Sequence, residues 1–239
     1  MILDCKNIVV TYVLKKKQYV EALKGLSISF ESGKVNIIFG ENGCGKTTLF
    51  NCITGFIGYD GEISLDGDNI NKLSVKDRKI SYVQQNLILY PKLNVFDNLA
   101  FPLKQAKLKP EDITRQIYEI LEDFKLTHIM NCLPNQISIG QFQKVLLAKA
   151  LITKPKILIL DEAFSNIDVA NKRFIQEKVQ EYSKNNDCIV IAVEHDFADA
   201  SYYGDHFILL DNEKVIFECD KDNKSLNKLS ELVMKHEKE

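Results

Sequence analysis

A short apolar run, Val35 to Phe39, passes directly into the glycine-rich sequence GENGCGKTT, Gly40 to Thr48, and no other stretch limits the possible folds so strongly. The apolar stretch beginning at Leu49 is typical of a helix, so the glycines lie between a strand and a helix. The sequence matches G-x-x-x-x-G-K-[ST], which in this context is a phosphate-binding loop. A chance glycine turn is the alternative, but a random chain of this length matches the four fixed positions only about once in a hundred times.

The chemistry of phosphate binding explains the spacing in this loop. Glycines allow a tight turn that points successive backbone N–H groups inward, and a helix starting near Lys46 directs its partial positive end to the same place. Lys46 adds a full charge at the β and γ phosphates, and the Thr47 hydroxyl is suited to hold Mg²⁺. The predicted nucleotide-binding residues of the loop are Gly40, Glu41, Asn42, Gly43, Cys44, Gly45, Lys46, Thr47 and Thr48.

Four further apolar runs lack the alternation of half-exposed strands and are typical of strands buried on both faces in a parallel sheet. They are Ile80–Val83, Ile157–Leu160, Ile189–Val193 and Phe207–Leu210. Two earlier runs, Ile8–Tyr12 and Leu26–Phe30, alternate more and predict a half-exposed antiparallel pair. Gly61, Asp66 and Gly67 indicate another hairpin around Glu62 to Leu65.

From about Asn86 to Pro155 the strand patterns give way to helical periodicity, as in Ile113, Ile117 and Leu121. The expected fold is α/β: a P-loop NTPase core with a largely parallel sheet, an N-terminal antiparallel β subdomain and an inserted helical subdomain. We predict one domain over 1–239, with the ATP-binding core and β subdomain in 1–85 and 156–239 and the helical subdomain in 86–155.

Composition excludes several classes of protein. The 239 residues carry a net charge of −2, which gives no bulk electrostatic case for a nucleic-acid partner. The longest unbroken apolar run, Ile189 to Val193, is far shorter than the roughly 20 residues of a membrane-spanning helix. The six cysteines form no C-x-x-C pair, which argues against a zinc or redox-dithiol site and favours small buried apolar residues. The N-terminal sequence lacks a secretory signal pattern, so we expect residence in the cytosol.

A second acidic element follows the run Ile157–Leu160 as Asp161 and Glu162. Asp161 is placed to bind Mg²⁺, directly or through water, and Glu162 to polarise the attacking water as general base. Acidic residues at strand ends are also frequent turn formers, so the pair is informative mainly in combination with the phosphate loop.

With these residues in place, the chain resembles the nucleotide-binding subunits of ATP-binding cassette (ABC) transporters over nearly its full length. Five further elements appear in the family's order: Tyr12 as the adenine-stacking aromatic, Gln85 as the metal- and water-sensing glutamine, Ile137 to Gln141 as the signature motif, Asp168 in the loop after the catalytic glutamate, and His195 as the switch histidine. The adjacent Gln84 is an alternative to Gln85. Taken singly, Tyr12 also fits edge-strand packing, His195 a polar cap, and Ser138 a helix N-cap.

The resemblance implies the roles of these residues. The catalytic set is Glu162, His195, Lys46 and Gln85, and the metal set is Thr47, Gln85 and Asp161. Ser138, Gly140 and Gln141 contact the nucleotide held by a partner subunit, because a serine and glycine at a helix N-terminus offer a second anion site. The active unit is then a head-to-tail pair, a homodimer or a pair with a paralogue, that encloses two ATP molecules with Mg²⁺.

The sequence departs from the family pattern at a few positions. Ile139 replaces the first glycine of the signature, and a β-branched residue is strained if that position needs φ > 0. Lys144 stands at a frequent arginine position and Glu194 replaces the common threonine before the histidine. Because Ser138 and Gly140 are retained, we expect a working contact.

The predicted function is an ATPase that powers transport through a separate integral membrane permease, with import favoured and with or without a substrate-binding protein. It is expected to lie peripherally on the inner face of the cell membrane and to contact the permease through about 86–102. Within that segment Leu89, Tyr90, Leu93, Val95 and Phe96 suggest an exposed groove, although they also suit packing inside the helical lobe. The alternatives are a soluble ABC ATPase of translation, DNA repair or protein assembly, and a P-loop kinase, for which no second substrate pocket is indicated.

Overall fold

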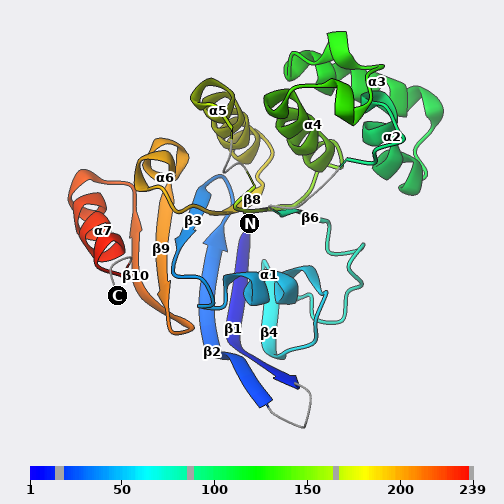
Figure 1. The fold of residues 1–239 in the computed structure, drawn as a ribbon. Helices are drawn as coiled ribbons and strands as arrows, with labels where there is room; N and C mark the ends of the chain where they lie inside the picture. The colour runs from blue at the N-terminus through cyan, green and yellow to red at the C-terminus, as the bar shows by residue number, and fades with distance from the viewer. Residues whose placement is uncertain (14–18, 85–88, 164–166, 237–239) are drawn as a thin grey trace.

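The computed structural model describes residues 1–13, 19–84, 89–163 and 167–236, which form two sheets and several helices (Figure 1). Helices α2, α3 and α4 stand together at the upper right of the view, away from the smaller sheet. Among the residues so described, no helix combines the length and the apolar character needed to cross a bilayer.

The larger sheet has six strands in the order β10-β9-β3-β8-β7-β6. All neighbouring strands from β9 to β6 run parallel, and β10 pairs antiparallel with β9. The strands are β3 (Val35–Phe39), β6 (Ile80–Gln84), β7 (Ile157–Asp161), β8 (Ile189–Val193), β9 (His206–Asp211) and β10 (Lys214–Asp220). Every residue of β3 and β8 is buried, as expected for strands covered on both faces. The predicted runs are strands, so the largely parallel sheet is confirmed, while β10 was not predicted.

The smaller sheet is antiparallel, with the order β2-β1-β4-β5. Its strands are β1 (Ile2–Val13), β2 (Tyr19–Glu31), β4 (Asp60–Leu65) and β5 (Asp68–Asn69). The predicted pairing holds, with Ile8 opposite Leu26, but both strands extend well beyond the predicted runs, and the first half of β1 also pairs with β4. Helix α1 (Lys46–Thr54) packs in one apolar cluster with both sheets, so the phosphate loop that precedes it is held from two sides.

The helices that lie between β6 and β7 along the chain confirm the expected helical subdomain. Its boundaries remain a prediction. The helices are α2 (Val95–Gln105), α3 (Pro110–Asp123) and α4 (Ile139–Leu151), with short 3₁₀ turns at η2 (Thr127–Ile129) and η3 (Pro134–Gln136). Helix α3 buries the predicted Ile113, Ile117 and Leu121. Helix α4 begins inside the signature motif, at Ile139, and Ser138 caps it.

Helices α5 (Val169–Asn185), α6 (Phe197–Tyr203) and α7 (Asn223–His236) follow β7, β8 and β10.

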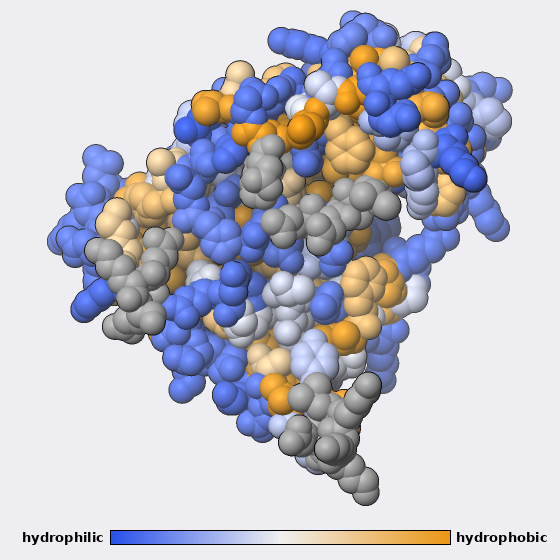
Figure 2. Space-filling model, in the orientation of Figure 1, coloured by the Kyte–Doolittle hydropathy of each residue, from blue (hydrophilic) through white to orange (hydrophobic). Residues whose placement is uncertain are grey.

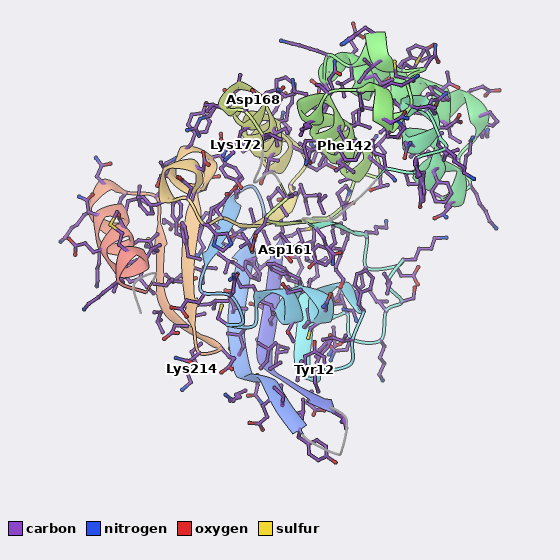
Figure 3. The ribbon with its side chains drawn as sticks, in the orientation of Figure 1. Tyr12, Phe142, Asp161, Asp168, Lys172 and Lys214 are labelled. Carbon is purple, nitrogen blue, oxygen red and sulfur yellow. The ribbon has the colours of Figure 1, made fainter. Side chains whose placement is uncertain are left out.

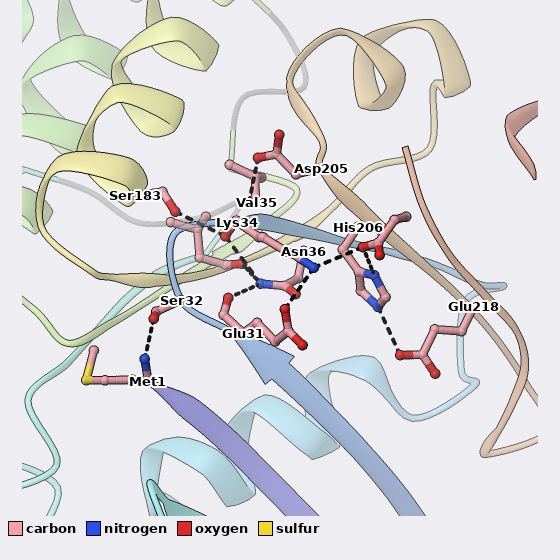
Figure 4. Close-up of polar contacts among 12 residues, drawn as sticks. Met1, Glu31, Ser32, Lys34, Val35, Asn36, Ser183, Asp205, His206 and Glu218 are labelled. Atoms are coloured by element: carbon pink, nitrogen blue, oxygen red, sulfur yellow. Dashed lines mark hydrogen bonds and ion pairs between the residues drawn. The ribbon is translucent and has the colours of Figure 1, made fainter. Parts of the chain in front are cut away.

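A polar network fixes the turn between β2 and β3 (Figure 4). The fully buried Asn36 donates from Nδ2 to the carbonyls of Glu31, Lys34 and Val190. Beside it, the ring nitrogens of His206 lie 2.9 Å from Asp220 Oδ1 and 2.9 Å from Glu218 Oε1. This network anchors the end of the sheet at which β3 begins.

Candidate active site

The strand order brings the predicted chemical groups together. In the parallel ladders Asp161 lies opposite Val193, and β3 lies directly beside β8. The segments that leave the carboxyl ends of β3, β7 and β8 therefore meet at one edge of the sheet, where ligands bind in open α/β folds. These segments carry Lys46, Glu162 and His195, and Figure 3 places Asp161 at the centre of the molecule.

The phosphate loop is formed as predicted from its sequence. Gly45 has φ +102°, and a Cβ there would lie 2.6 Å from Leu23 Cδ2, so only glycine fits. Lys46 is 6% exposed, and its Nζ donates to the carbonyls of Gly40 at 2.6 Å and Glu41 at 2.9 Å. The N-cap residue of α1 is Gly45, which has no side chain to cap the helix, so the first N–H groups of α1 are available to an anion.

A surface pocket lies in front of this loop. Its lining is Ala22, Asn42, Gly43, Gly45, Lys46, Thr47, Thr48, Asp161 and Glu162. Beneath it, burial raises the pKa of the Cys44 thiol, although the Lys46 ammonium opposes that shift. The pocket therefore combines one lysine, helix N–H groups and two carboxylates.

Asp161 accepts two hydrogen bonds on the same oxygen, Oδ2: the Tyr82 hydroxyl donates at 2.8 Å and the Thr47 hydroxyl at 3.3 Å. Burial raises the pKa of Tyr82 far above its usual range, so this phenol remains a donor. A hydroxyl and a carboxylate in direct contact are hard oxygen ligands of the kind that Mg²⁺ prefers, so the residues fit this ion. Tyr82 was missed by the sequence reasoning, because a tyrosine inside an apolar strand looks like packing.

Glu162 and His195 meet at the pocket, with His195 Nε2 2.7 Å from Glu162 Oε1. Their side chains are 24% and 50% exposed, so water reaches both. Glu162 has φ +51°, a left-handed conformation that is uncommon for a residue other than glycine. Strain of this kind clusters at functional sites, and here it accompanies a carboxylate held against an imidazole.

The signature segment forms the start of α4. Ser138 and Gln141 make a capping box: Gln141 N donates to Ser138 Oγ at 3.3 Å, and Ser138 N donates to Gln141 Oε1 at 3.0 Å. Ile139 is 69% exposed, and it lies in the helix and not in the left-handed region, so it causes no strain. The buried Gly140 packs against Asn171 of α5.

Asp168 caps α5, accepting from Asn171 N at 3.0 Å and from Asn171 Nδ2 at 2.6 Å. These bonds hold the pKa of Asp168 below its usual value. The predicted loop residue and the predicted signature glycine thus share one neighbour, Asn171. Figure 3 shows Asp168 on α5, well away from Tyr12.

Several predicted site residues do not line the pocket in the described structure, among them Tyr12, Asp168 and the signature residues Ser138, Gly140 and Gln141. Tyr12 pairs with Val20 in the β1–β2 hairpin and is 38% exposed, and neither it nor Ser138 lines the pocket. Gln85 lies outside the described residues, while Gln84 ends β6 opposite Asp161. The roles of these residues remain predictions.

The five apolar residues suggested for an exposed groove after Gln85 do not share one environment, and the packing alternative is correct for two of them. Leu89 is 2% and Val95 0% exposed, because both pack into the core of the helical subdomain. Tyr90 is 42% exposed, its ring packs against Phe101 with the two ring planes tilted by 52°, and Lys149 Nζ lies 4.1 Å from the centre of the Tyr90 ring. On the face drawn in Figure 2, hydrophobic residues gather over the helical subdomain and beside α1.

Comparison with known proteins places these features in a family context. The family described as ABC transporter matches residues 23–165. The spermidine/putrescine import ATP-binding protein PotA of Hahella chejuensis is 34% identical over 216 residues, which cover 87% of this chain and 59% of that protein. The molybdate/tungstate import ATP-binding protein WtpC of Pyrococcus horikoshii is 37% identical over 191 residues, covering 79% of this chain and 55% of that protein. The chain thus spans less than two thirds of the length of these relatives.

Solved structures give the same result. A dimeric structure of a bacterial ABC transporter cassette superposes with a TM-score of 0.80 at 27% identity and covers 91% of this chain and 98% of its own. The ADP conformation of another such cassette gives a TM-score of 0.83 at 27% identity, with 98% and 97% coverage.

Proposed function

This chain belongs to the ABC transporter family, and from that premise we propose that it is the ATP-hydrolysing subunit of an importer. The observation that carries the proposal is the meeting of Lys46, Asp161 and Glu162 around one pocket at the edge of the parallel sheet. The names of the relatives support the direction of transport, since both PotA and WtpC are import ATP-binding proteins.

Phosphate binding begins with Lys46. Its ammonium is held by the backbone carbonyls of Gly40 and Glu41, which are neutral acceptors. A triphosphate offers charged acceptors, which form stronger hydrogen bonds, so Lys46 turns to the β and γ phosphates when ATP binds. The uncapped N-terminus of α1 stabilises the same negative charge.

Thr47, Asp161 and Gln85 would hold Mg²⁺, and Tyr82 would orient Asp161 for that task. When bound, Mg²⁺ neutralises charge that develops on the phosphate oxygens. The Tyr82 hydroxyl fixes Oδ2 of Asp161 at 2.8 Å, so the carboxylate is held in one orientation before the ion arrives.

Hydrolysis requires a base for the attacking water, and Glu162 is the carboxylate best placed to accept its proton. His195, whose Nε2 lies 2.7 Å from Glu162 Oε1, orients Glu162 for this step. The dimer completes the site: Ser138, Gly140 and Gln141 of one subunit would contact the nucleotide of the other, with Asp168 at the same interface.

The partners follow from this role. A separate membrane permease would dock near residues 86–102, where Tyr90 is exposed beside Lys149. Bound to that permease, the protein would lie peripherally on the cytoplasmic face of the membrane. The cargo differs among the similar importers, polyamines for one and molybdate or tungstate for another, which is consistent with selection by the permease or a substrate-binding protein. A soluble ABC ATPase of translation, repair or assembly is not favoured.

The test combines ATPase assays with co-purification. Glu162→Gln should abolish turnover and retain ATP binding, and Lys46→Ala should weaken binding itself. Glu119→Gln, whose side chain is 68% exposed on α3, is the matched control and should turn over ATP at the parental rate. Tagged protein extracted from its host in detergent should carry an integral membrane subunit. Parental turnover by Glu162→Gln would contradict the base assignment, and co-purification with ribosomes or DNA instead of a permease would contradict the transport role.

A further inference from the structure

Behind the Glu162–His195 pair lies a second acidic group that the proposed reaction does not use. Glu194 directly follows β8 and precedes His195, and its Oε1 accepts a hydrogen bond of 2.7 Å from the Tyr203 hydroxyl. Tyr203 is the last residue of α6 and only 2% exposed. A buried phenol requires an acceptor, so this bond determines where Glu194, and with it the turn into α6, can lie.

The partner of Glu194 is itself fixed. The Tyr203 carbonyl accepts from Gln180 Nε2 of α5 at 2.9 Å. At the other end of α6, Asp196 caps the helix by accepting from Asp199 N at 2.9 Å. His195 is therefore the single residue between two anchored residues, Glu194 and Asp196.

We propose that Glu194 and Tyr203 are positioning residues for His195: their hydrogen bond holds the turn between β8 and α6 so that His195 Nε2 stays against Glu162. The inference rests on the proposed function, because the consequence for turnover depends on His195 and Glu162 acting in hydrolysis. Neither residue touches the nucleotide in this scheme.

The charge of Glu194 makes the arrangement sensitive to pH. Burial raises the pKa of Glu194 to about 7, and Asp199 of α6 adds to the shift, whereas the Tyr203 hydrogen bond, Lys172 of α5 and His195 oppose it. A hydrogen bond to an ionised acceptor is stronger than one to a neutral acceptor, so the turn is held more firmly above this pKa than below it. Turnover should therefore fall as the pH drops through about 7.

The kinetic test compares Tyr203→Phe, Glu194→Gln and their double variant with Tyr202→Phe. The control removes a similar bond from the same helix, since the exposed Tyr202 donates to Glu177 Oε1 at 2.9 Å. Misplaced catalytic groups slow chemistry more than binding, so Tyr203→Phe should lower kcat about 10-fold with little change in KM for ATP. Glu194→Gln keeps an acceptor and should retain most of the activity at pH 8, without the inflection near pH 7. The double variant should be no slower than Tyr203→Phe alone.

A second readout does not depend on hydrolysis. The chain has 4 histidines, so the ring signal of His195 can be assigned in NMR spectra by comparison with a His195→Gln variant. Tyr203→Phe should move that signal and Tyr202→Phe should not, and a glutamate side-chain carbonyl that titrates near pH 7 should be missing from Glu194→Gln. An unmoved His195 signal together with parental kcat in Tyr203→Phe would overturn the inference. A moved signal in a protein that never hydrolyses ATP would instead support the positioning and refute the proposed function.

Discussion

Replacing Gly140 by alanine tests whether the signature turn depends on its contact with α5. A Cβ at Gly140 would lie 2.2 Å from Asn171 Nδ2 and 2.6 Å from Asn171 Cγ, which no side chain tolerates without movement. Asn171 must therefore rotate away and release Asp168, to which Nδ2 donates at 2.6 Å. Overpacking a buried contact costs about 1–3 kcal/mol, and the helix propensity of alanine returns up to about 1 kcal/mol, less in a first turn. The expected net loss is about 1–2 kcal/mol of unfolding free energy.

Thermal unfolding measures this loss. In a protein of this size 1 kcal/mol corresponds to roughly 2–4 °C, so Tm should fall by about 2–8 °C. Gly58→Ala is the matched control, because a Cβ there meets nothing within 4 Å and its φ is not in the left-handed region. The control should leave Tm unchanged or slightly raised.

A second substitution isolates the steric cause. Asn171→Ala removes the atoms that the new methyl group would strike, so Gly140→Ala in that background should cost much less stability than in the parent. Equal losses in both backgrounds would refute the contact as the cause. An unchanged Tm for Gly140→Ala alone would refute the packing of α4 on α5 described above.

Three further changes probe the pocket and the dimer. Ser138→Arg should leave ATP binding by the single subunit intact and abolish hydrolysis that rises with protein concentration; unchanged activity would contradict a site shared between subunits. Tyr82→Phe should weaken the Mg²⁺ dependence of ATP binding in calorimetry by about 10-fold, since one hydrogen bond to a charged group contributes about 1.5 kcal/mol, and an unchanged Mg²⁺ dependence would remove Tyr82 from that role. Because burial raises the pKa of Cys44, its alkylation followed by mass spectrometry should be slow at pH 7, faster at pH 9, and should block nucleotide binding; full binding after complete alkylation would contradict this.

The phosphate loop and the strand ends could be predicted because their patterns are local. Val35–Phe39 and Ile189–Val193 are strands with the predicted bounds, and the parallel order then places Asp161 and Glu162 beside the loop. Buried parallel strands can be recognised in a sequence as continuous apolar runs, and ligand-binding residues lie just after their carboxyl ends. Neither inference requires knowledge of distant contacts.

The remaining features depend on contacts that the sequence does not display. Tyr203 and Glu194 are separated by nine positions and are joined because Tyr203, at the end of α6, comes back to the residue that follows β8. Leu89 looked exposed because apolar character alone does not reveal which face of a segment meets a neighbour, and it is buried in the helical core.

Helix α5 connects the two parts of the proposed site through consecutive residues at its start. Asn171 contacts Gly140 of α4, while Lys172 Nζ lies 2.6 Å from Asp199 Oδ2 of α6. A displacement of α4 that shifts α5 must therefore also displace α6. This helix begins one residue after Asp196 and ends at Tyr203, the hydrogen-bond partner of Glu194. Gly140→Ala should consequently move the His195 signal in NMR spectra, and the added substitution Lys172→Met should reduce that movement by releasing α6. An equal movement of the His195 signal with and without Lys172 would show that the signature turn and the histidine are coupled by another route, and no movement in either protein would show that they are not coupled.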